Sequence, residues 1–278
     1  MVEIKNLGFD YGKTPLFENI SITLTGGHIY GLLGENGVGK TTLLTLLCGL
    51  KKPKSGTIRT DGYNPYNREP SFLQDQYFLA DNIPAFNMKA CDFAKINGKF
   101  RDKFDYEKFI TIMKEFDTDP SFMMNKMSYG QLKKCYISFA LACNVKYLYM
   151  DEPTNGLDIP SKTQFRSAIS RFTNEDSTIV ISTHQVRDLE NIIDPVIILD
   201  NNDILLNASI EKITEKLYFD YTYSNIEEGS QLLYEENIAG SNIKVMTNKN
   251  EIESKVNLEA LFNAVLRNKQ FIKEIFNK

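Results

Sequence analysis

The chain has 278 residues, of which 42% are hydrophobic and 24% are charged. These fractions are typical of a globular protein with a buried core, and they argue against a disordered or fibrous chain. The formal net charge of −4 disfavours a nucleic-acid binder that works through bulk positive charge. The four cysteines form no CxxC pair, so the spacing predicts neither a structural zinc site nor a disulfide framework.

The lengths of the apolar stretches show whether the chain could cross a membrane. The longest of them, residues 135–145, is too short to cross ~30 Å of hydrocarbon. Residues 1–12 carry acids and lack the apolar core of a secretory signal peptide. We therefore expect a cytoplasmic chain, and any membrane-embedded partner has to be a separate polypeptide.

The first fifty residues predict strands around a glycine-rich turn. Residues 20–24 alternate apolar and polar side chains, which is typical of a half-buried strand. Residues 29–33 are a short apolar run typical of a buried parallel strand. A glycine loop at 34–42 follows, and leucines at helical spacing come after it. Strand, loop and helix in this order is the arrangement that a phosphate-binding loop requires.

The middle of the chain predicts helices that alternate with strands. Apolar residues at helical spacing within 87–125 predict two or three short helices, and Ser128 opens another that runs to about residue 144. Apolar runs predict strands at 145–150, 178–182 and 196–199. This alternation favours an α/β architecture with a mostly parallel sheet.

The chain changes character after about residue 207. It becomes polar and contains several tyrosines and glutamates, and then closes with a helical pattern. We interpret residues 206–278 as an appended module. The apolar stripe of its closing helix, which needs a surface to cover, consists of Leu258, Leu261, Phe262, Val265 and Leu266.

The glycine loop matches the phosphate-binding pattern GxxxxGK[ST], also called Walker A. Glycines let successive backbone N–H groups point at phosphate oxygens, and the start of the helix adds the positive end of its dipole. Lys40 would then reach the β- and γ-phosphates, and the Thr41 hydroxyl would ligate Mg²⁺. The nucleotide-binding residues predicted here are Gly34, Glu35, Asn36, Gly37, Val38, Gly39, Lys40, Thr41 and Thr42.

A second group of candidate residues stands where the strand at 145–150 ends in Asp151 and Glu152. Carboxylates at a buried strand end must be compensated, and Mg²⁺ with ATP provides that compensation. Asp151 would hold the metal through its hydration shell. Glu152 would polarise the attacking water as general base, so we predict Glu152 and Lys40 to be catalytic.

Taken together, these motifs resemble the ATP-binding subunits of ABC transporters over residues 1–205. Residues 127–131 (MSYGQ) are similar to the family signature usually written LSGGQ, with Tyr129 in place of the first glycine. Ser128 and Gln131 also form a helix capping box by their spacing. The resemblance implies that Ser128, Gly130 and Gln131 contact the γ-phosphate of a nucleotide held by another subunit. Tyr129 restricts backbone approach to phosphate, which leaves its effect on turnover open.

Three further residues are named by the resemblance. His184, after the strand at 178–182, resembles the family's switch histidine, so we add it to the catalytic residues. Tyr11 resembles the aromatic residue that stacks on adenine. The family also has a glutamine, sometimes an acid, that joins the core to the helical subdomain. Residues 72–79 offer Gln74 or Asp75 for this position, and we select Gln74 as a nucleotide and metal ligand.

The resemblance implies a P-loop NTPase (RecA-like) core with a mostly parallel sheet, an antiparallel β subdomain and a helical subdomain at about 87–135. The ATP-binding domain is expected at 1–205 and a C-terminal α+β extension at 206–278. The implied cofactors are ATP and Mg²⁺, with Mg²⁺ held by Thr41, Gln74 and Asp151.

The implied function is an Mg²⁺-dependent ATPase that dimerises around ATP and drives a separate transmembrane permease at the cytoplasmic face of the membrane. Its second ATP-binding subunit is an identical or a related chain, and no nucleic acid is expected. Residues 257–262 resemble the tail of exporter-type ATPases, which favours export. Two alternatives stay open: a soluble ATPase of the same type that serves translation or DNA repair, and a regulatory subunit that hydrolyses ATP weakly.

Overall fold

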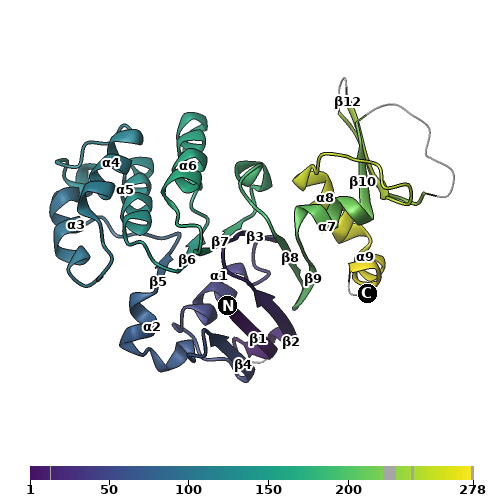
Figure 1. Ribbon diagram of the computed structural model, residues 1–278, viewed down its shortest axis with the longest axis horizontal. Helices are drawn as coiled ribbons and strands as arrows, with labels where there is room; N and C mark the ends of the chain where they lie inside the picture. The colour runs from purple at the N-terminus through teal and green to yellow at the C-terminus, as the bar shows by residue number, and fades with distance from the viewer. Residues whose placement is uncertain (13, 222–229, 239–240, 277–278) are drawn as a thin grey trace.

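The computed structural model describes residues 1–12, 14–221, 230–238 and 241–276. A mixed α/β core lies in the middle of an elongated molecule, with a helical subdomain at one end and the C-terminal extension at the other (Figure 1). Within the described ranges, none of the helices combines the length and the apolarity needed to traverse a bilayer.

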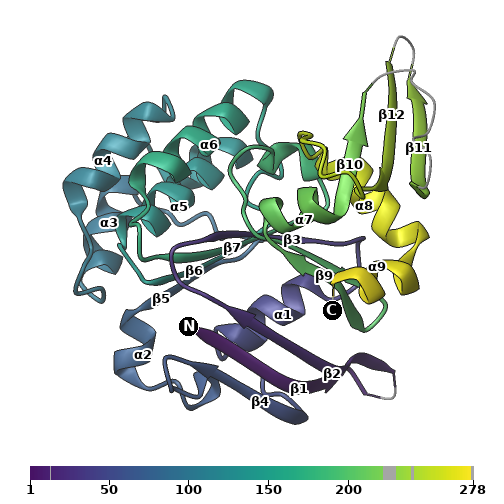
Figure 2. The same ribbon diagram turned by 45° about the vertical axis from the view of Figure 1, so that its right-hand side comes forward.

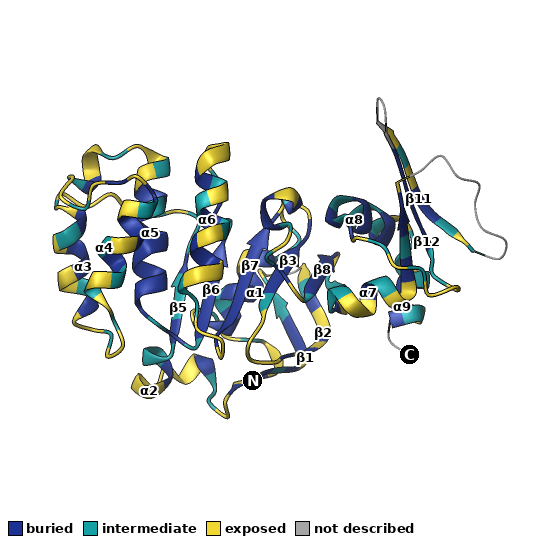
Figure 3. Ribbon diagram, turned by 45° about the horizontal axis from the view of Figure 1, so that its top comes forward, coloured by how far each residue is buried: buried dark blue, intermediate teal, exposed yellow. Residues whose placement is uncertain are grey.

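The core is built on a six-stranded sheet with the order β5-β6-β7-β3-β8-β9. Strands from β5 to β8 pair in parallel with their neighbours, and only β9 is antiparallel to β8. All residues of β6, β7 and β8 are buried, as expected for apolar runs covered on both faces (Figure 3). The predicted mostly parallel sheet is confirmed. Its strands are β3 (Ile29–Leu33), β5 (Gln76–Leu79), β6 (Tyr147–Asp151), β7 (Thr178–Thr183), β8 (Val196–Asp200) and β9 (Asp203–Ala208).

A second, antiparallel sheet with the order β2-β1-β4 covers one side of the core (Figure 2). Helix α1 lies between the two sheets. Its leucines, such as Leu44 and Leu47, share one buried cluster with Ile4 of the antiparallel sheet and Tyr149 of β6. Helix α1 is therefore held from both sides, which fixes the loop that leads into it. The elements are β1 (Val2–Asp10), β2 (Pro15–Leu24), α1 (Lys40–Leu47) and β4 (Ser55–Thr60).

The helical subdomain packs against the other face of the parallel sheet. Phe93 and Phe109 are buried in one cluster with Leu148 of β6 and Phe165 of α6. The short helices predicted within 87–125 and the helix opened by Ser128 are confirmed. The helical elements from residue 65 to residue 189 are η1 (Pro65–Asn67), α2 (Pro70–Gln74), α3 (Ala90–Gly98), α4 (Tyr106–Glu115), η2 (Met124–Lys126), α5 (Tyr129–Ala142), α6 (Ile159–Phe172) and η3 (Val186–Leu189).

The C-terminal extension is a three-stranded antiparallel sheet, order β10-β12-β11, with helices on one face. The core strand β9 spans Asp203–Ala208 and so crosses the predicted boundary at residue 205. Leu261 and Val265 of α8 are fully buried and belong to the same apolar cluster as Ile198 of β8. The extension and the core therefore share buried apolar contacts. Its elements are α7 (Ile210–Lys216), β10 (Leu217–Asp220), β11 (Leu232–Ile238), β12 (Ser241–Thr247), α8 (Leu258–Arg267) and α9 (Lys269–Phe276).

The shared cluster leads to a prediction about cooperativity. Leu261→Ala should lower the free energy of unfolding of the whole chain by about 2–5 kcal/mol, because a fully buried leucine is truncated. Leu50→Ala is the control, since Leu50 is 55% exposed and its truncation should cost less than about 0.5 kcal/mol. Urea unfolding followed by far-UV circular dichroism and tyrosine fluorescence checks this. An early, separate transition in the Leu261 variant would contradict a shared core.

Candidate active site

The glycine loop at 34–39 connects β3 to α1 at the carboxyl edge of the parallel sheet. Gly37 and Gly39 have φ angles of 87° and 106°, in a region that residues with a Cβ rarely adopt. A Cβ on Gly39 would also come within 2.8 Å of the Phe17 ring. The loop therefore needs glycine both for its backbone conformation and for its close packing on β2.

Lys40 is the first residue of α1 and its side chain is buried inside the loop. Its Nζ donates hydrogen bonds to the carbonyl oxygens of Gly34 at 2.8 Å and Glu35 at 3.0 Å. Glu152 Oε1 lies 3.8 Å from the same ammonium. Burial lowers the pKa of Lys40, although the carboxylates of Glu152 and Asp151 act in the opposite direction. The loop thus encloses a cation, as a site for a triphosphate requires.

Asp151 ends β6 and is 3% exposed, so its carboxylate needs partners. Two hydroxyl groups supply them. Thr41 Oγ1 donates to Asp151 Oδ2 at 2.7 Å, and Ser182 Oγ donates to Asp151 Oδ1 at 2.5 Å. One hydroxyl group from α1 and one from β7 thus partner the two oxygens of this carboxylate. These hydrogen bonds join the ends of three elements at one point.

Glu152 follows Asp151 in a strained backbone conformation with φ 46°. Its Oε1 accepts a hydrogen bond from the His184 backbone N–H at 3.1 Å and lies 2.9 Å from His184 Nδ1. Its own N–H donates to Ser182 O at 3.1 Å. The structure therefore brings together the three residues that we predicted to be catalytic, with Lys40 and His184 both close to Glu152 Oε1.

These residues open into a cavity of about 360 Å³. The Tyr11 hydroxyl hydrogen-bonds to Thr42 Oγ1 at 3.0 Å at its margin, and the Tyr11 ring is 59% exposed. Of the loop residues predicted to bind nucleotide, Gly34, Glu35 and Val38 do not line the cavity. Its lining is Tyr11, Leu16, Asn36, Gly37, Gly39, Lys40, Thr41, Thr42, Asp81, Asp151 and Glu152.

The signature residues lie at the start of α5, away from this cavity. Ser128 and Gln131 form the predicted capping box: Ser128 Oγ accepts from Gln131 N at 3.2 Å, and Gln131 Oε1 accepts from Ser128 N at 3.0 Å. Neither residue, nor Gly130, lines the cavity of its own subunit. Within one subunit the structure does not bring them to the glycine loop.

Gln74 is not brought to the site. It precedes β5, on the opposite edge of the sheet from Asp151, and its amide bonds to Phe100 O at 3.1 Å and Asp102 N at 3.2 Å. Asp75, the alternative, pairs with Lys103. The carboxylate that reaches the site is Asp81, which follows the carboxyl end of β5 and lines the cavity. Asp81 is not among the residues predicted from the sequence, because the apolar and polar pattern around Gln74 and Asp75 covers only residues 72–79, which end with β5.

Asp81 has an unusual partner. Lys133, on α5, has a side chain that is 0% exposed, and its Nζ lies 3.1 Å from Asp81 Oδ1, whereas the Asp81 side chain is 32% exposed. Among the described residues, Asp81 is the only carboxylate within salt-bridge distance of Lys133. Burial lowers the pKa of Lys133, while Asp81 and, at longer range, the carboxylates of Asp151 and Glu152 act in the opposite direction. Asp81 is thus the ion-pair partner of the buried ammonium.

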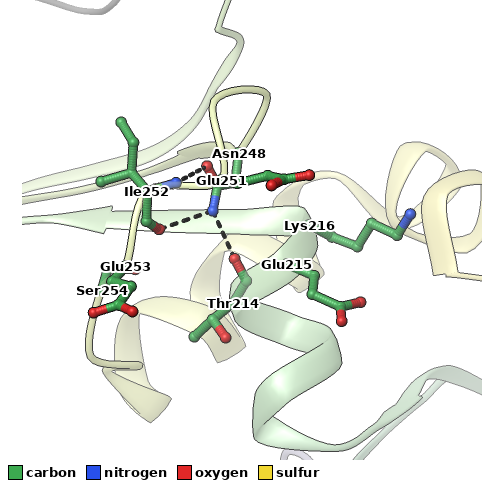
Figure 4. Close-up of a pocket in the computed structure, with 8 residues that line it drawn as sticks. All are labelled: Thr214, Glu215, Lys216, Asn248, Glu251, Ile252, Glu253 and Ser254. Carbon is green, nitrogen blue, oxygen red and sulfur yellow. Dashed lines mark hydrogen bonds between the residues drawn. The ribbon is translucent and has the colours of Figure 1, made fainter.

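A larger cavity of about 660 Å³ lies in the extension, between α7 and the segment after β12 (Figure 4). Asn248 holds its wall by donating to Thr214 O at 2.7 Å and to Ile252 O at 2.9 Å. It contains no predicted site residue, and its three glutamates repel a phosphate. The lining residues are Thr214, Glu215, Lys216, Asn248, Glu251, Ile252, Glu253 and Ser254.

Comparison with known proteins agrees with the site at the glycine loop. The sequence profile of the ABC transporter family matches residues 17–155. A putative ABC transporter ATP-binding protein of Pyrococcus furiosus is 32% identical over 230 residues, which cover 77% of this chain and 86% of that protein. The chain belongs to the ABC transporter family.

Other ABC transporter proteins are also similar to this chain in sequence or in structure. The bacitracin transport ATP-binding protein BcrA of Enterococcus faecalis is 28% identical over 235 residues, covering 82% of this chain and 75% of BcrA. A solved ATP-binding subunit of an ABC transporter superposes with a TM-score of 0.70 at 20% identity, covering 77% of this chain and 91% of that one. The predicted P-loop NTPase fold is confirmed by this structural likeness.

The Asp81–Lys133 pair leads to an asymmetric prediction. Asp81→Ala should lower the free energy of unfolding by about 3 kcal/mol, because it leaves a buried ammonium without its counter-ion. Lys133→Met should cost much less, since Asp81 is partly exposed and its carboxylate can be hydrated. Urea unfolding at pH 7 without nucleotide measures both. Equal costs, or a larger cost for Lys133→Met, would contradict a buried cation that depends on Asp81.

Proposed function

We propose that this chain is the Mg²⁺-dependent ATPase subunit of an ABC transporter, and that it dimerises head to tail around ATP. The observation that carries the proposal is the meeting of Lys40, Asp151 and Glu152 at one cavity on the carboxyl edge of the parallel sheet. Nucleotides bind at this edge in open α/β folds. The cavity offers a buried cation, a glycine loop and three carboxylates, which are the kinds of group that phosphoryl transfer uses.

The residues present suit Mg²⁺. This ion prefers oxygen ligands and is usually held by one or two carboxylates together with substrate phosphates and water. The Thr41 hydroxyl and the carboxylates of Asp151 and Asp81 provide such oxygens. When bound, Mg²⁺ neutralises charge on the β- and γ-phosphates.

Glu152 is proposed as the general base. Its Oε1 is occupied by the His184 N–H, while among the described residues no hydrogen bond reaches Oε2. Oε2 is therefore the atom that would accept a proton from water. Lys40 would bind phosphate oxygens in place of the loop carbonyls that its Nζ now contacts, and His184 would hold Glu152 in orientation.

The second half of the site would come from a partner subunit. Helix α5 presents the positive end of its dipole at Ser128, which suits a γ-phosphate. We propose that ATP bridges the glycine loop of one subunit and the signature of the other. A separate permease would dock on the helical subdomain. The resemblance of residues 257–262, at the start of α8, to exporter tails favours export, and the transport role in the name of BcrA agrees with a transporter.

The domain division at 1–205 and 206–278 stays a prediction. The core sheet reaches Ala208, so we propose 1–208 as the ATP-binding domain, with the extension packed on it.

Two substitutions test the proposed chemistry. Lys40→Ala should abolish ATP binding, because the cation inside the loop is removed. Glu152→Gln should keep ATP binding but lower the rate of hydrolysis by about 10²–10⁴-fold, the usual contribution of a general base. Equilibrium ATP binding, phosphate release and size-exclusion chromatography measure these effects. The Glu152 variant should elute as a dimer with ATP, and unchanged turnover in it would refute the proposed base.

His184 provides a finer test. His184→Ala keeps the backbone N–H that bonds Glu152 and removes only the imidazole. We expect hydrolysis to fall by roughly tenfold or more with ATP affinity unchanged, since one of two contacts to the base is lost. Steady-state phosphate release at several ATP concentrations separates kcat from KM. A normal kcat would make His184 a packing residue.

Tyr129 favours a second candidate function, that of a regulatory subunit that hydrolyses ATP weakly. Its ring stands where the family signature has glycine, and it is 43% exposed. A phosphate-release assay on the purified protein distinguishes the two functions. ATP-dependent dimerisation without turnover would favour the regulatory subunit.

A further inference from the structure

Asp81 is held by three donors that come from two other parts of the chain. Its Oδ1 accepts from Lys133 Nζ at 3.1 Å and lies 3.4 Å from Asn155 Nδ2 and 3.5 Å from the Tyr129 hydroxyl. Its backbone oxygen accepts from the Tyr129 hydroxyl at 2.9 Å and from Lys133 Nζ at 3.1 Å. In the described part of the chain no hydrogen bond reaches Oδ2. One oxygen is fixed, and the other is available at the cavity.

The Tyr129 ring fits against Gly156. A Cβ on Gly156 would come within 2.6 Å of Tyr129 Cδ1, and Gly156 has a φ angle of 78°. The Lys133 ammonium lies over the same ring, 5.7 Å from its centroid. The tyrosine is thus packed between a glycine and a buried cation, with its hydroxyl directed to Asp81. Contacts within its own subunit therefore fix the position of the Tyr129 side chain.

We propose that Tyr129 and Lys133 are positioning residues that hold the Asp81 carboxylate at the edge of the phosphate site, with Oδ2 directed to bound Mg²⁺ and nucleotide. This inference rests on the proposed function, because it concerns how the same site takes up its metal. It gives Tyr129 a role within its own subunit, where the family signature has glycine.

The burial of Lys133 explains why Asp81 and α5 form one unit. The Lys133 side chain is 0% exposed, so its ammonium cannot exchange Asp81 for water. Lys133 therefore ties Asp81 to the first turns of α5.

The test compares two tyrosines of α5. Tyr129→Phe removes one hydroxyl that donates to Asp81 O, and Tyr136→Phe removes one that donates to Pro84 O at 2.8 Å, so the second is a matched control. Neither changes the charge of the site. Affinity for the non-hydrolysable analogue AMP-PNP is measured by calorimetry on the full chain, once with EDTA and once with excess Mg²⁺. The readout is the gain in affinity that Mg²⁺ gives.

With EDTA, all three proteins should bind the analogue equally, because the glycine loop is unchanged. With Mg²⁺, the gain should be about three- to tenfold smaller for Tyr129→Phe than for the parent, as expected for one lost hydrogen bond, and unchanged for Tyr136→Phe. An unchanged gain in Tyr129→Phe overturns the inference while leaving the proposed function intact. No binding by the parent in either medium overturns the proposed function, and this inference with it.

A second background shows whether Tyr129 acts through Asp81. In the double variant Asp81→Ala/Lys133→Met both charges are absent, so Tyr129→Phe should have no further effect on the Mg²⁺ gain. The same loss as in the parent background would mean that Tyr129 acts by another route and would overturn the inference. If this double variant does not fold, the comparison of the two tyrosines still decides.

Discussion

The arrangement of the site depends on the carboxylate of Asp151 and the two hydroxyl groups that bond to it. Thr41 belongs to the helix that follows the glycine loop, and Ser182 belongs to the neighbouring parallel strand, so one buried side chain fixes three elements. Parallel strands end at a common edge, which places Glu152 and the loop cation Lys40 beside the same point. The cavity suits a triphosphate because the fold places Lys40, Asp151 and Glu152 close together at this edge of the sheet.

The central strands were predictable because each is a continuous apolar run buried on both faces. Strand β1 was not, and the reason is local. Asn6 has a φ angle of 50°, and the pairing with β2 shifts register between Ile4 and Leu7, so the alternation of apolar and polar side chains is interrupted. The start of α5 was predictable because Ser128 and Gln131 carry the capping box in their spacing alone.

Asp81 illustrates what local patterns cannot give. Gln74 precedes β5 and Asp81 follows it, so the two residues lie at opposite ends of a strand of four residues. The parallel pairing of β5 with β6 shows that the carboxyl end of β5 faces the site. The partner of Asp81, Lys133, is 52 positions away in the sequence. A buried lysine on a helix also contradicts the usual exposure of that residue. Such a pair becomes visible only when the fold brings its members together.

Buried ion pairs are weak evidence for stability, because an apolar pair of similar volume is often as stable. We therefore infer that Lys133 contributes by limiting the positions that the Asp81 side chain can adopt. With its ammonium shielded from water, it restricts Asp81 to one position beside the phosphate site. Tyr129 adds a second restriction, because its hydroxyl bonds to Asp81 and its ring packs in the space left by Gly156. A residue that departs from the family signature is thus accommodated entirely by contacts within its own subunit, while Ser128 stays at the exposed start of α5. The positive end of the α5 dipole still lies at Ser128.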